Sequence, residues 1–412
     1  MHNPIRADAR QYYLNAYNLF HFGVYSVDAP DQSGNRPRTS WRRTPGYPLF
    51  LYPFFYFSKT PTEFVVNVSL AQAILGSLTC ALVFYLGLSF LTPFWAVIAG
   101  LASALSPHLI AMDDFLLSES LFMFTLVAAT LALVQSFRQR SSGLAFISGA
   151  LFCFSALVRA VSGLLGLFMF LCFLVAPRYW KKGGRFNFLV PTTCFLIGLA
   201  VIHLPYSHIR RQIIANADWV TNESAWQHVV IGADINLDNF FRNKRIPEFK
   251  NQTEKMINDR SYGLTVLRQR FQENPAGYLK WYLGGKLLFM WKWDNVYNGD
   301  VYQYPMVVKG FHQENWLAAL HRFMRWLHWP SIALAIMGIG LFLFNWFRNN
   351  LAKSEYLLLA PILVFIYFAI IFTILLPLPR YMIPVRPFVY LIGCYPLLLS
   401  SRYLNRFLFK NA

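Results

Sequence analysis

The chain has 412 residues, of which 56% are hydrophobic and 14% are charged. Soluble domains carry about a quarter charged residues, so this composition excludes a soluble enzyme, a disordered chain and a small disulfide-stabilised domain. The net charge of +18 is divided among short loops between apolar blocks. A nucleic-acid-binding surface would need the basic residues on one soluble domain, so anionic lipids and lipid-linked substrates are the expected partners.

The first polar segment, residues 1–62, predicts an interfacial helix followed by an arginine-rich loop. Asp8 opens the helix, apolar side chains then recur at helical spacing, and Gly23 ends it. The loop carries Arg36, Arg38, Arg42 and Arg43 and leads into Tyr47. The residues alone leave two interpretations open: a helix cap with lipid-contacting arginines, or a group that carries chemistry.

A helix needs about 20 apolar residues to cross a bilayer, and nine stretches of the sequence approach this length. The expected spans are Phe64–Leu91, Pro93–Ile110, Phe115–Phe137, Gly143–Val158, Val161–Ala176, Phe188–Tyr206, Trp326–Phe347, Tyr356–Leu376 and Ile383–Ser400. The two stretches beside Arg159 are short for spans. Tyr278–Trp293 contains three lysines, which favours an interfacial or re-entrant helix. The five cysteines all fall inside apolar blocks and are interpreted as packing residues.

The basic residues of the short loops predict the orientation in the membrane. Alternation of the nine spans places four segments on one side, all without Asp or Glu: Arg138–Ser142, Pro177–Arg185, Arg348–Lys353 and the tail after Ser401. That side is expected to be the cytoplasm.

This orientation divides the chain into four regions. Residues 1–62 form an outward first loop with interfacial helices, and 63–206 contain transmembrane helices. Residues 207–325 form a second outward loop, and 326–412 hold the C-terminal transmembrane helices with a short cytoplasmic tail. The first region carries seven Lys and Arg residues. Because such a segment is poorly exported unaided, we expect a further transmembrane helix to precede Met1 in the full-length protein.

Two groups of charged residues lie at helix mouths on the predicted outer side. Asp113 and Asp114 precede a span that begins near Glu119, and the basic counterparts are Arg159, Arg380-Tyr381 and Arg386. Charged groups at membrane depth face a bundle interior or a cavity and need partners. The carboxylates could cap helices or form structural salt bridges with the arginines. A bound phosphate could equally be the partner of the arginines, because guanidinium binds it in a bidentate manner.

Several other chemistries are excluded by the motifs. The histidines have no metal-site spacing, and no glycine-rich phosphate loop or serine-hydrolase elbow occurs. The glycosylation sequon occurs at Asn222-Glu223-Ser224 and Asn251-Gln252-Thr253, a weak signal by itself.

Five short elements, in this order along nearly the whole chain, resemble integral-membrane glycosyltransferases of the GT-C fold. The resemblance is to the branch with protein O-mannosyltransferases, lipid A aminoarabinose transferase and related enzymes that use polyprenyl-phosphate sugars. The elements are Asp8 with its Tyr-rich helix, Arg43-Thr44-Pro45-Gly46-Tyr47-Pro48, Leu116-Leu117-Ser118-Glu119, Ala156-Leu157-Val158-Arg159 and Pro379-Arg380-Tyr381. Two features differ: Ala7 and Ala9 flank Asp8 where the family often has a second acid, and the family has a transmembrane helix before this loop.

The resemblance implies an all-α, polytopic helix bundle with outward interfacial helices and an inverting transfer of one sugar. Asp8 would be the general base and Arg43, Arg159 and Arg380 would hold the leaving phosphate. Tyr47, Glu119 and Tyr381 would complete the substrate site, and Asp113 or Asp114 would orient the sugar. No cofactor is required, although a divalent cation could bind beside these two carboxylates. The absence of the large soluble C-terminal domain of oligosaccharyltransferases favours transfer of a single sugar.

The sequence therefore predicts a multi-pass transferase of a bacterial inner membrane whose site faces the periplasm. Its partners would be a polyprenyl-phosphate-linked sugar, a hydroxyl acceptor of the cell envelope and membrane lipid, and not nucleic acid. Two alternatives are an O-antigen polymerase or ligase and a transporter or flippase of a lipid-linked sugar. The first has no need for the Asp8 helix, and the second would be expected to show inverted repeats and broken helices.

Overall fold

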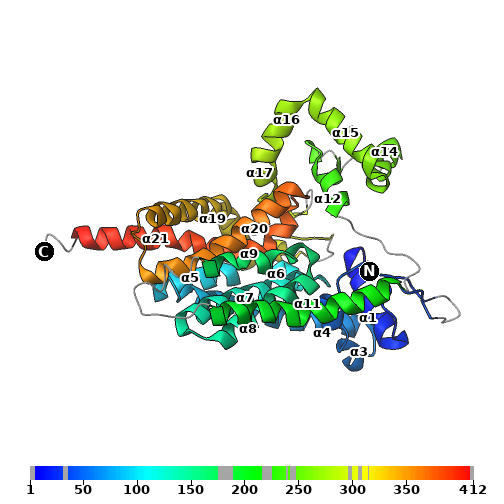
Figure 1. The fold of residues 1–412 in the computed structure, drawn as a ribbon, viewed down its shortest axis with the longest axis horizontal. Coiled ribbons are helices and arrows are strands. Elements are labelled where there is room, and N and C mark those ends of the chain that lie inside the picture. The colour runs from blue at the N-terminus through cyan, green and yellow to red at the C-terminus, as the bar shows by residue number, and fades with distance from the viewer. Residues whose placement is uncertain are drawn as a thin grey trace. The chain divides into compact units, whose positions relative to one another are not determined.

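The computed structural model describes residues 5–30, 36–174, 189–215, 225–237, 240–241, 247–295, 299–304, 309–313 and 315–408. These residues form helices and no β-strand (Figure 1), which confirms the predicted all-α class. The chain divides into two compact units. Unit 1 contains Met1–Trp219, Met306–Ile366 and Pro384–Ala412, and unit 2 contains Val220–Pro305 and Tyr367–Ile383. The predicted basic segment Pro177–Arg185 and the sequon at Asn222 lie outside the described residues.

Within the described part of the chain, six helical stretches are long and apolar enough to cross a membrane. They are α4 (Pro61–Gly87), α7 (Glu119–Gln139), α11 (Leu189–Ala215), α19 (Asn315–Phe347), Lys353–Ile374 with α20 (Leu359–Ile374), and Pro379–Leu404, which includes much of α21 (Arg386–Leu408). The pair α5 (Pro93–Ala104) and α6 (Pro107–Asp113), bent by 50°, raises the total to seven. The chain is therefore a multi-pass membrane protein.

The two predicted spans beside Arg159 are shorter than a membrane span. They correspond to α8 (Ser142–Val158) and to the apolar stretch Ala160–Leu174, which contains α9 (Leu165–Met169). Arg159 interrupts the helix with an extended backbone, φ −141° and ψ 116°. These two segments form a hairpin, so together they cross the membrane either twice or not at all. The predicted orientation of every other span is therefore the same in both cases.

Local sequence signals explain where α4 begins. The Thr60 hydroxyl accepts a hydrogen bond from the Glu63 backbone N–H at 3.2 Å, and Pro61 occupies the first helical position. The Glu63 carboxylate in turn accepts from the Lys59 N–H at 2.7 Å. This reciprocal capping satisfies N–H groups that a helix start leaves without partners.

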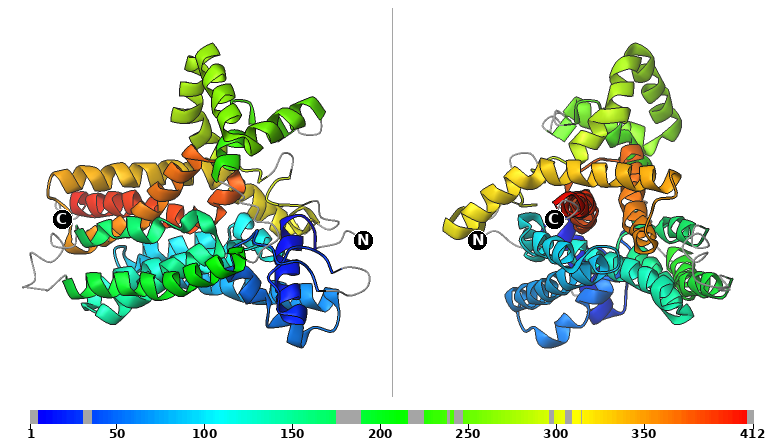
Figure 2. Two further views of the ribbon diagram at one scale, coloured as in Figure 1. Left: turned by 45° about the vertical axis from the view of Figure 1, so that its right-hand side comes forward. Right: turned by 90° about the vertical axis from the view of Figure 1, so that its left-hand side faces the viewer.

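The long helices of unit 1 run approximately alongside one another (Figures 1 and 2). Helices α1 (Asp8–Phe22), α2 (Gly46–Leu51) and α3 (Phe54–Phe57) lie at one end of this bundle, and α21 ends at the other. The first polar segment therefore gathers at a single end of unit 1.

Glycines allow α8 and α11 to approach closely. A Cβ atom on Gly149 would overlap the Phe195 carbonyl oxygen, and one on Gly198 would overlap the Phe146 carbonyl oxygen. Small residues at such positions let two membrane helices pack backbone against backbone. The hairpin that carries Arg159 is thus fixed against α11 by two glycines.

We expect Gly149→Ala to lower the thermal stability of the purified protein. The added methyl group must push α11 away, and overpacking of this kind costs about 1–3 kcal/mol. Gly340→Ala is the matched control, because a Cβ atom there meets no atom within 4 Å. Equal melting temperatures for the two variants, measured by differential scanning fluorimetry in detergent, would contradict this packing.

Unit 2 is a second helical body with its own core. Its helices are α12 (Ala225–Gly232), α14 (Pro247–Asn258), α15 (Arg260–Glu273), α16 (Pro275–Lys280), a π-helical turn Trp281–Gly285, α17 (Lys286–Met290) and the end of α20. The buried cluster consists of Leu237, Phe240, Trp281, Phe289 and Leu376. In this unit the side chain of Lys286 is fully buried, and its Nζ donates to the Thr373 and Leu375 carbonyl oxygens at 2.8 and 2.9 Å.

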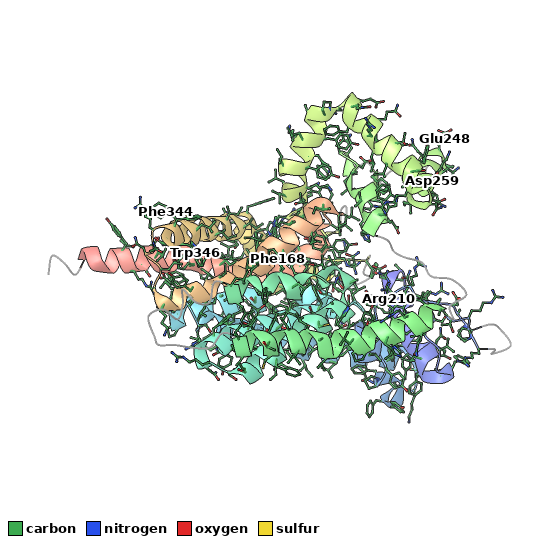
Figure 3. The ribbon with its side chains drawn as sticks, viewed as in Figure 1. Phe168, Arg210, Glu248, Asp259, Phe344 and Trp346 are labelled. Atoms are coloured by element: carbon green, nitrogen blue, oxygen red, sulfur yellow. The ribbon has the colours of Figure 1, made fainter. Side chains whose placement is uncertain are left out.

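Asp259 caps the start of α15, and Figure 3 labels it together with Glu248. The Asp259 carboxylate accepts hydrogen bonds from the Ser261 hydroxyl at 2.6 Å and the Tyr262 N–H at 3.0 Å. These bonds lower the pKa of Asp259 because they favour its charged form.

Candidate active site

Asp8 is the first residue of α1, and Gly23 ends the helix in the left-handed conformation at φ 64°, both as predicted. The capping interpretation of Asp8 is wrong, since Ala7 occupies the cap position and no side chain caps the helix. Ala7 itself has φ 47° and ψ −123°. A residue with a Cβ atom in such a conformation stores about 1–3 kcal/mol of strain, which is characteristic of functional sites.

The Asp8 carboxylate is held by Arg43. Arg43 Nη2 donates to Asp8 Oδ1 at 2.7 Å, and its Nε donates to Gln11 Oε1 at 2.8 Å. The guanidinium also lies over the Tyr12 ring, 5.3 Å from its centre. Side-chain exposure is 35% for Asp8 and 16% for Arg43. The carboxylate is therefore fixed in orientation and remains accessible to another molecule.

The loop that carries Arg43 is fixed by its neighbours. Burial raises the pKa of Tyr25 well above its usual value, and its hydroxyl donates to the Arg43 carbonyl oxygen at 2.7 Å. The Thr44 hydroxyl donates to the Val158 carbonyl oxygen at 3.3 Å. A Cβ atom on Gly46 would come within 2.6 Å of the Leu157 backbone. The loop therefore rests directly on the end of α8, beside Arg159.

Arg159 pairs with Glu119. Its Nη1 lies 2.8 Å from Glu119 Oε1, with side-chain exposures of 14% and 1%. The Arg159 guanidinium lies 5.8 Å from the centre of the Phe122 ring. Of the two partners that the sequence left open for Arg159, the carboxylate contacts it in this structure, and the phosphate-binding role stays a prediction.

The two ion pairs belong to one cluster within unit 1. The Tyr12 and Ser118 hydroxyl oxygens lie 3.3 Å apart, which joins α1 to the residue before Glu119. The Tyr12 and Tyr47 rings pack edge to face with centres 5.0 Å apart. Burial raises the pKa of Tyr47 well above its usual value, and its hydroxyl donates to Gln72 Oε1 at 2.5 Å.

Asp113 and Asp114 have different surroundings. The Ser120 hydroxyl donates to Asp113 Oδ1 at 2.5 Å, while the Gln72 amide donates to the Asp113 carbonyl oxygen at 2.9 Å. Asp114 is exposed at the end of α6. No group of three or more His, Cys, Asp and Glu among the described residues is placed to hold a metal ion.

A pocket lies on the side of α1 that faces the loop after Gly23. Its volume is about 440 Å³, and its lining includes Arg10, Gln11, Asp28 and Arg42. Gln11 both lines this pocket and accepts the hydrogen bond from Arg43. The pocket therefore borders the Asp8–Arg43 pair. Because the pocket forms only when the loop is folded, no sequence motif predicts it.

A second buried basic group was incompletely predicted. The sequence identified Arg386 as an arginine at membrane depth, and the structure adds His328 and His108 beside it. Arg386 Nη1 and His328 Nδ1 lie 3.2 Å apart, and the His328 and His108 rings stack with centres 6.3 Å apart. No sequence motif marks this group, because the histidines are loosely spaced along the chain. The group forms where α6, α19 and α21 meet.

Arg380 and Tyr381 belong to unit 2. Arg380 is buried, with 7% of its surface exposed, and the Tyr381 ring stacks on Phe372 with centres 5.2 Å apart. Of the predicted site residues, unit 1 alone therefore supplies the cluster of Asp8, Arg43, Tyr47, Glu119 and Arg159.

No protein-family model and no curated protein matches this sequence. Two solved structures of the oligosaccharyltransferase of Archaeoglobus fulgidus are similar in fold. The form in complex with an inhibitory peptide and a dolichol-phosphate has a TM-score of 0.51 and 13% identity, over 98% of this chain and 48% of that one. The apo form has a TM-score of 0.52, with 13% identity and the same coverage.

The chain thus spans about half the length of these structures. At this identity the likeness concerns the fold, and it extends along nearly the whole of the present chain. The fold is similar to that of this oligosaccharyltransferase, which confirms the fold that the sequence motifs predicted. The chain has the GT-C fold.

Proposed function

We propose that the protein is an inverting glycosyltransferase that moves a single sugar from a polyprenyl-phosphate donor to a hydroxyl acceptor. The observation that carries this proposal is the Asp8–Arg43 pair at the start of α1, in a chain with the GT-C fold. The solved structure with a dolichol-phosphate supports a donor of this lipid class. The sugar would be a hexose or a pentose.

The chemistry is a single displacement. The acceptor hydroxyl gives its proton to the Asp8 carboxylate as its oxygen bonds to the anomeric carbon. The bond between that carbon and the phosphate oxygen breaks, and the electron pair leaves on the lipid phosphate. Arg43 adjoins Asp8 and would neutralise the charge that develops on this phosphate.

The other cluster residues take supporting roles in this proposal. Glu119 and Arg159 would position the Ser118–Glu119 corner against Tyr12, because both are committed to their mutual ion pair. Arg380 and Tyr381 would contribute to donor binding. Asp113 or Asp114 would orient the sugar, and the pocket beside Gln11 would receive the acceptor. No step requires a metal ion.

We expect Arg43→Gln to lower the transfer rate by about 10²–10³-fold, the usual cost of removing a donor that stabilises developing negative charge. Arg43→Lys keeps the charge but loses the simultaneous contact with Asp8 and Gln11, so a smaller loss of about tenfold is expected. Arg38→Gln, at an exposed arginine of the same loop, is the control. If all three variants transferred sugar at the wild-type rate, Arg43 would have no catalytic role.

In this proposal the protein lies in a bacterial inner membrane, and the Asp8 cluster faces the periplasm. Basic residues near helix ends away from Asp8 support a cytoplasmic location for the opposite end of the bundle. They are Arg138, Arg348, Lys353 and Arg402. Acceptors on that outer side would be lipid, protein or glycan of the cell envelope.

The test uses membranes that contain the protein, incubated with radiolabelled polyprenyl-phosphate sugars. Label that moves into a lipid, protein or polysaccharide fraction, beyond the level in membranes without the protein, would establish transfer and name the acceptor class. Movement of the intact donor between leaflets without transfer would instead show a flippase. Growth of a polysaccharide in repeat-unit steps would show a polymerase or ligase.

A further inference from the structure

A second pocket lies in unit 1, with a volume of about 470 Å³. Four separate segments line it: the turn between α4 and α5, the end of α7, the start of the span that leads into α20, and the late part of α21. Its polar lining comprises three cations and three hydroxyl groups: Ser89, Thr92, Arg138, Lys353, Ser354 and Arg402.

This pocket lies at the end of the bundle opposite to the Asp8 cluster. Glu119 begins α7 in that cluster, and Arg138 lies in the last turn of the same helix. Nineteen helical steps of about 1.5 Å place these residues about 28 Å apart along the axis, close to the thickness of a bilayer core. The pocket is therefore separate from the proposed catalytic site and lies at the level of the opposite lipid headgroups.

The lining carries an excess of positive charge. Arg402 Nη1 contacts Glu355 Oε1 at 2.6 Å, and the Glu355 side chain is 4% exposed. Arg138 Nη1 donates to the Ser89 hydroxyl at 3.4 Å. The described lining residues include Arg138, Lys353 and Arg402 and no Asp or Glu, and with Glu355 beside Arg402 these four residues have a formal net charge of +2.

The rest of the lining is apolar. Leu88, Phe90, Leu91 and Leu357 contribute to the same pocket. A small inorganic anion would gain nothing from these side chains, whereas a lipid has a phosphate for the cations and the first carbons of its acyl chains for the leucines. Basic pockets between transmembrane helices bind anionic lipid headgroups in this way.

We infer that this pocket binds the phosphate headgroup of an anionic phospholipid. Arg138 and Lys353 contact the phosphate, and the Ser89 and Thr92 hydroxyls donate to its oxygens. The bound lipid joins the α4–α5 turn to the start of the α20 span and to α21, so it stabilises the bundle at this end. The inference does not depend on the proposed transfer reaction.

The experiment compares wild-type protein with the double variant Arg138→Gln, Lys353→Gln, both purified in detergent. Both side chains are exposed, so the double variant is expected to fold. Phosphatidylglycerol is added, and retained lipid is counted by native mass spectrometry, with phosphatidylcholine as the neutral lipid. The control is the double variant Arg348→Gln, Lys309→Gln, which removes the same charge elsewhere. Arg348 lies over Phe344, a residue labelled in Figure 3, and lines no part of the pocket.

The expected result is that wild type and the control double variant retain phosphatidylglycerol and the pocket variant binds it about 30-fold more weakly. Each basic residue beside an anionic lipid contributes a factor of about five. Equal retention by the pocket variant would overturn the site. A parallel arm replaces the lipid with inorganic phosphate. If inorganic phosphate alone stabilised the wild-type protein as much as the lipid does, and the pocket variant lost this effect, the lipid assignment would be overturned. The pocket would then be a free-phosphate site.

Discussion

Asp8→Asn is expected to lower the rate of sugar transfer by about 10²–10⁴-fold, the usual contribution of a positioned general base. Asparagine keeps the size of the side chain and can still accept the hydrogen bond from Arg43 Nη2, now 2.7 Å from Asp8 Oδ1. It cannot accept the proton of the acceptor hydroxyl. The variant therefore isolates proton transfer from the placement of Arg43.

Glu63→Gln is the matched control for this variant. It removes one negative charge at an exposed position of α4 near the same end of unit 1, and glutamine can replace glutamate in the cap that starts this helix. Initial transfer rates are compared in membranes with equal amounts of each protein. A rate for Asp8→Asn within twofold of the Glu63→Gln rate would remove Asp8 from the mechanism, although the fold would stand.

The second large effect is expected on stability, at the pair of Glu119 and Arg159. Arg159→Gln leaves the Glu119 carboxylate, 1% exposed, without its cation. Breaking a buried pair on one side costs about 3–5 kcal/mol, because the remaining charge stays desolvated. The double variant Glu119→Gln, Arg159→Gln removes both charges, and most of the lost stability should return.

Chemical or thermal unfolding in detergent measures this cycle of two single variants and one double variant. Donor binding, measured on the same proteins, separates the structural role from the phosphate-binding role that the sequence also allowed. A stable Arg159→Gln protein that binds the donor weakly would contradict the structural role and restore the phosphate site. A coupling free energy near zero would show that the pair contributes nothing.

Most of the helical architecture could be predicted from the sequence because membrane spans depend on local composition. The start of α1 at Asp8 and its end at Gly23 were also predicted correctly, since helical periodicity and a terminal glycine are signals that act over a few residues. The segment before Arg159 was predicted at the right position and as short for a span, and α8 has 17 residues. Apolar composition cannot distinguish a short packed helix from a spanning one.

The partners within the site could not be predicted in the same way. Asp8 and Arg43 are 35 residues apart in the chain, and Tyr12 and Ser118 are 106 apart. Their contacts depend on how α1, α2 and α7 pack, which no local pattern encodes. The sequence selected residue types that need partners at membrane depth, but for Arg159 it left carboxylate and phosphate open.

The two histidines beside Arg386 show the same limit. His108 and His328 are separated by about half of the chain and meet through the packing of α6 against α19. The basic pocket near Arg138 is likewise formed by four segments that are far apart in the sequence, three of which contribute one cation each.

The anomeric configuration of the product tests the central claim most directly. Wild-type protein is given a polyprenyl-phosphate sugar of known configuration, and the product is analysed by NMR while the released lipid is identified. The account predicts inversion at the anomeric carbon with release of one polyprenyl monophosphate per sugar transferred, since Asp8 activates the acceptor for a single displacement. Retention of configuration would require a covalent or double-displacement route and would contradict the role assigned to Asp8.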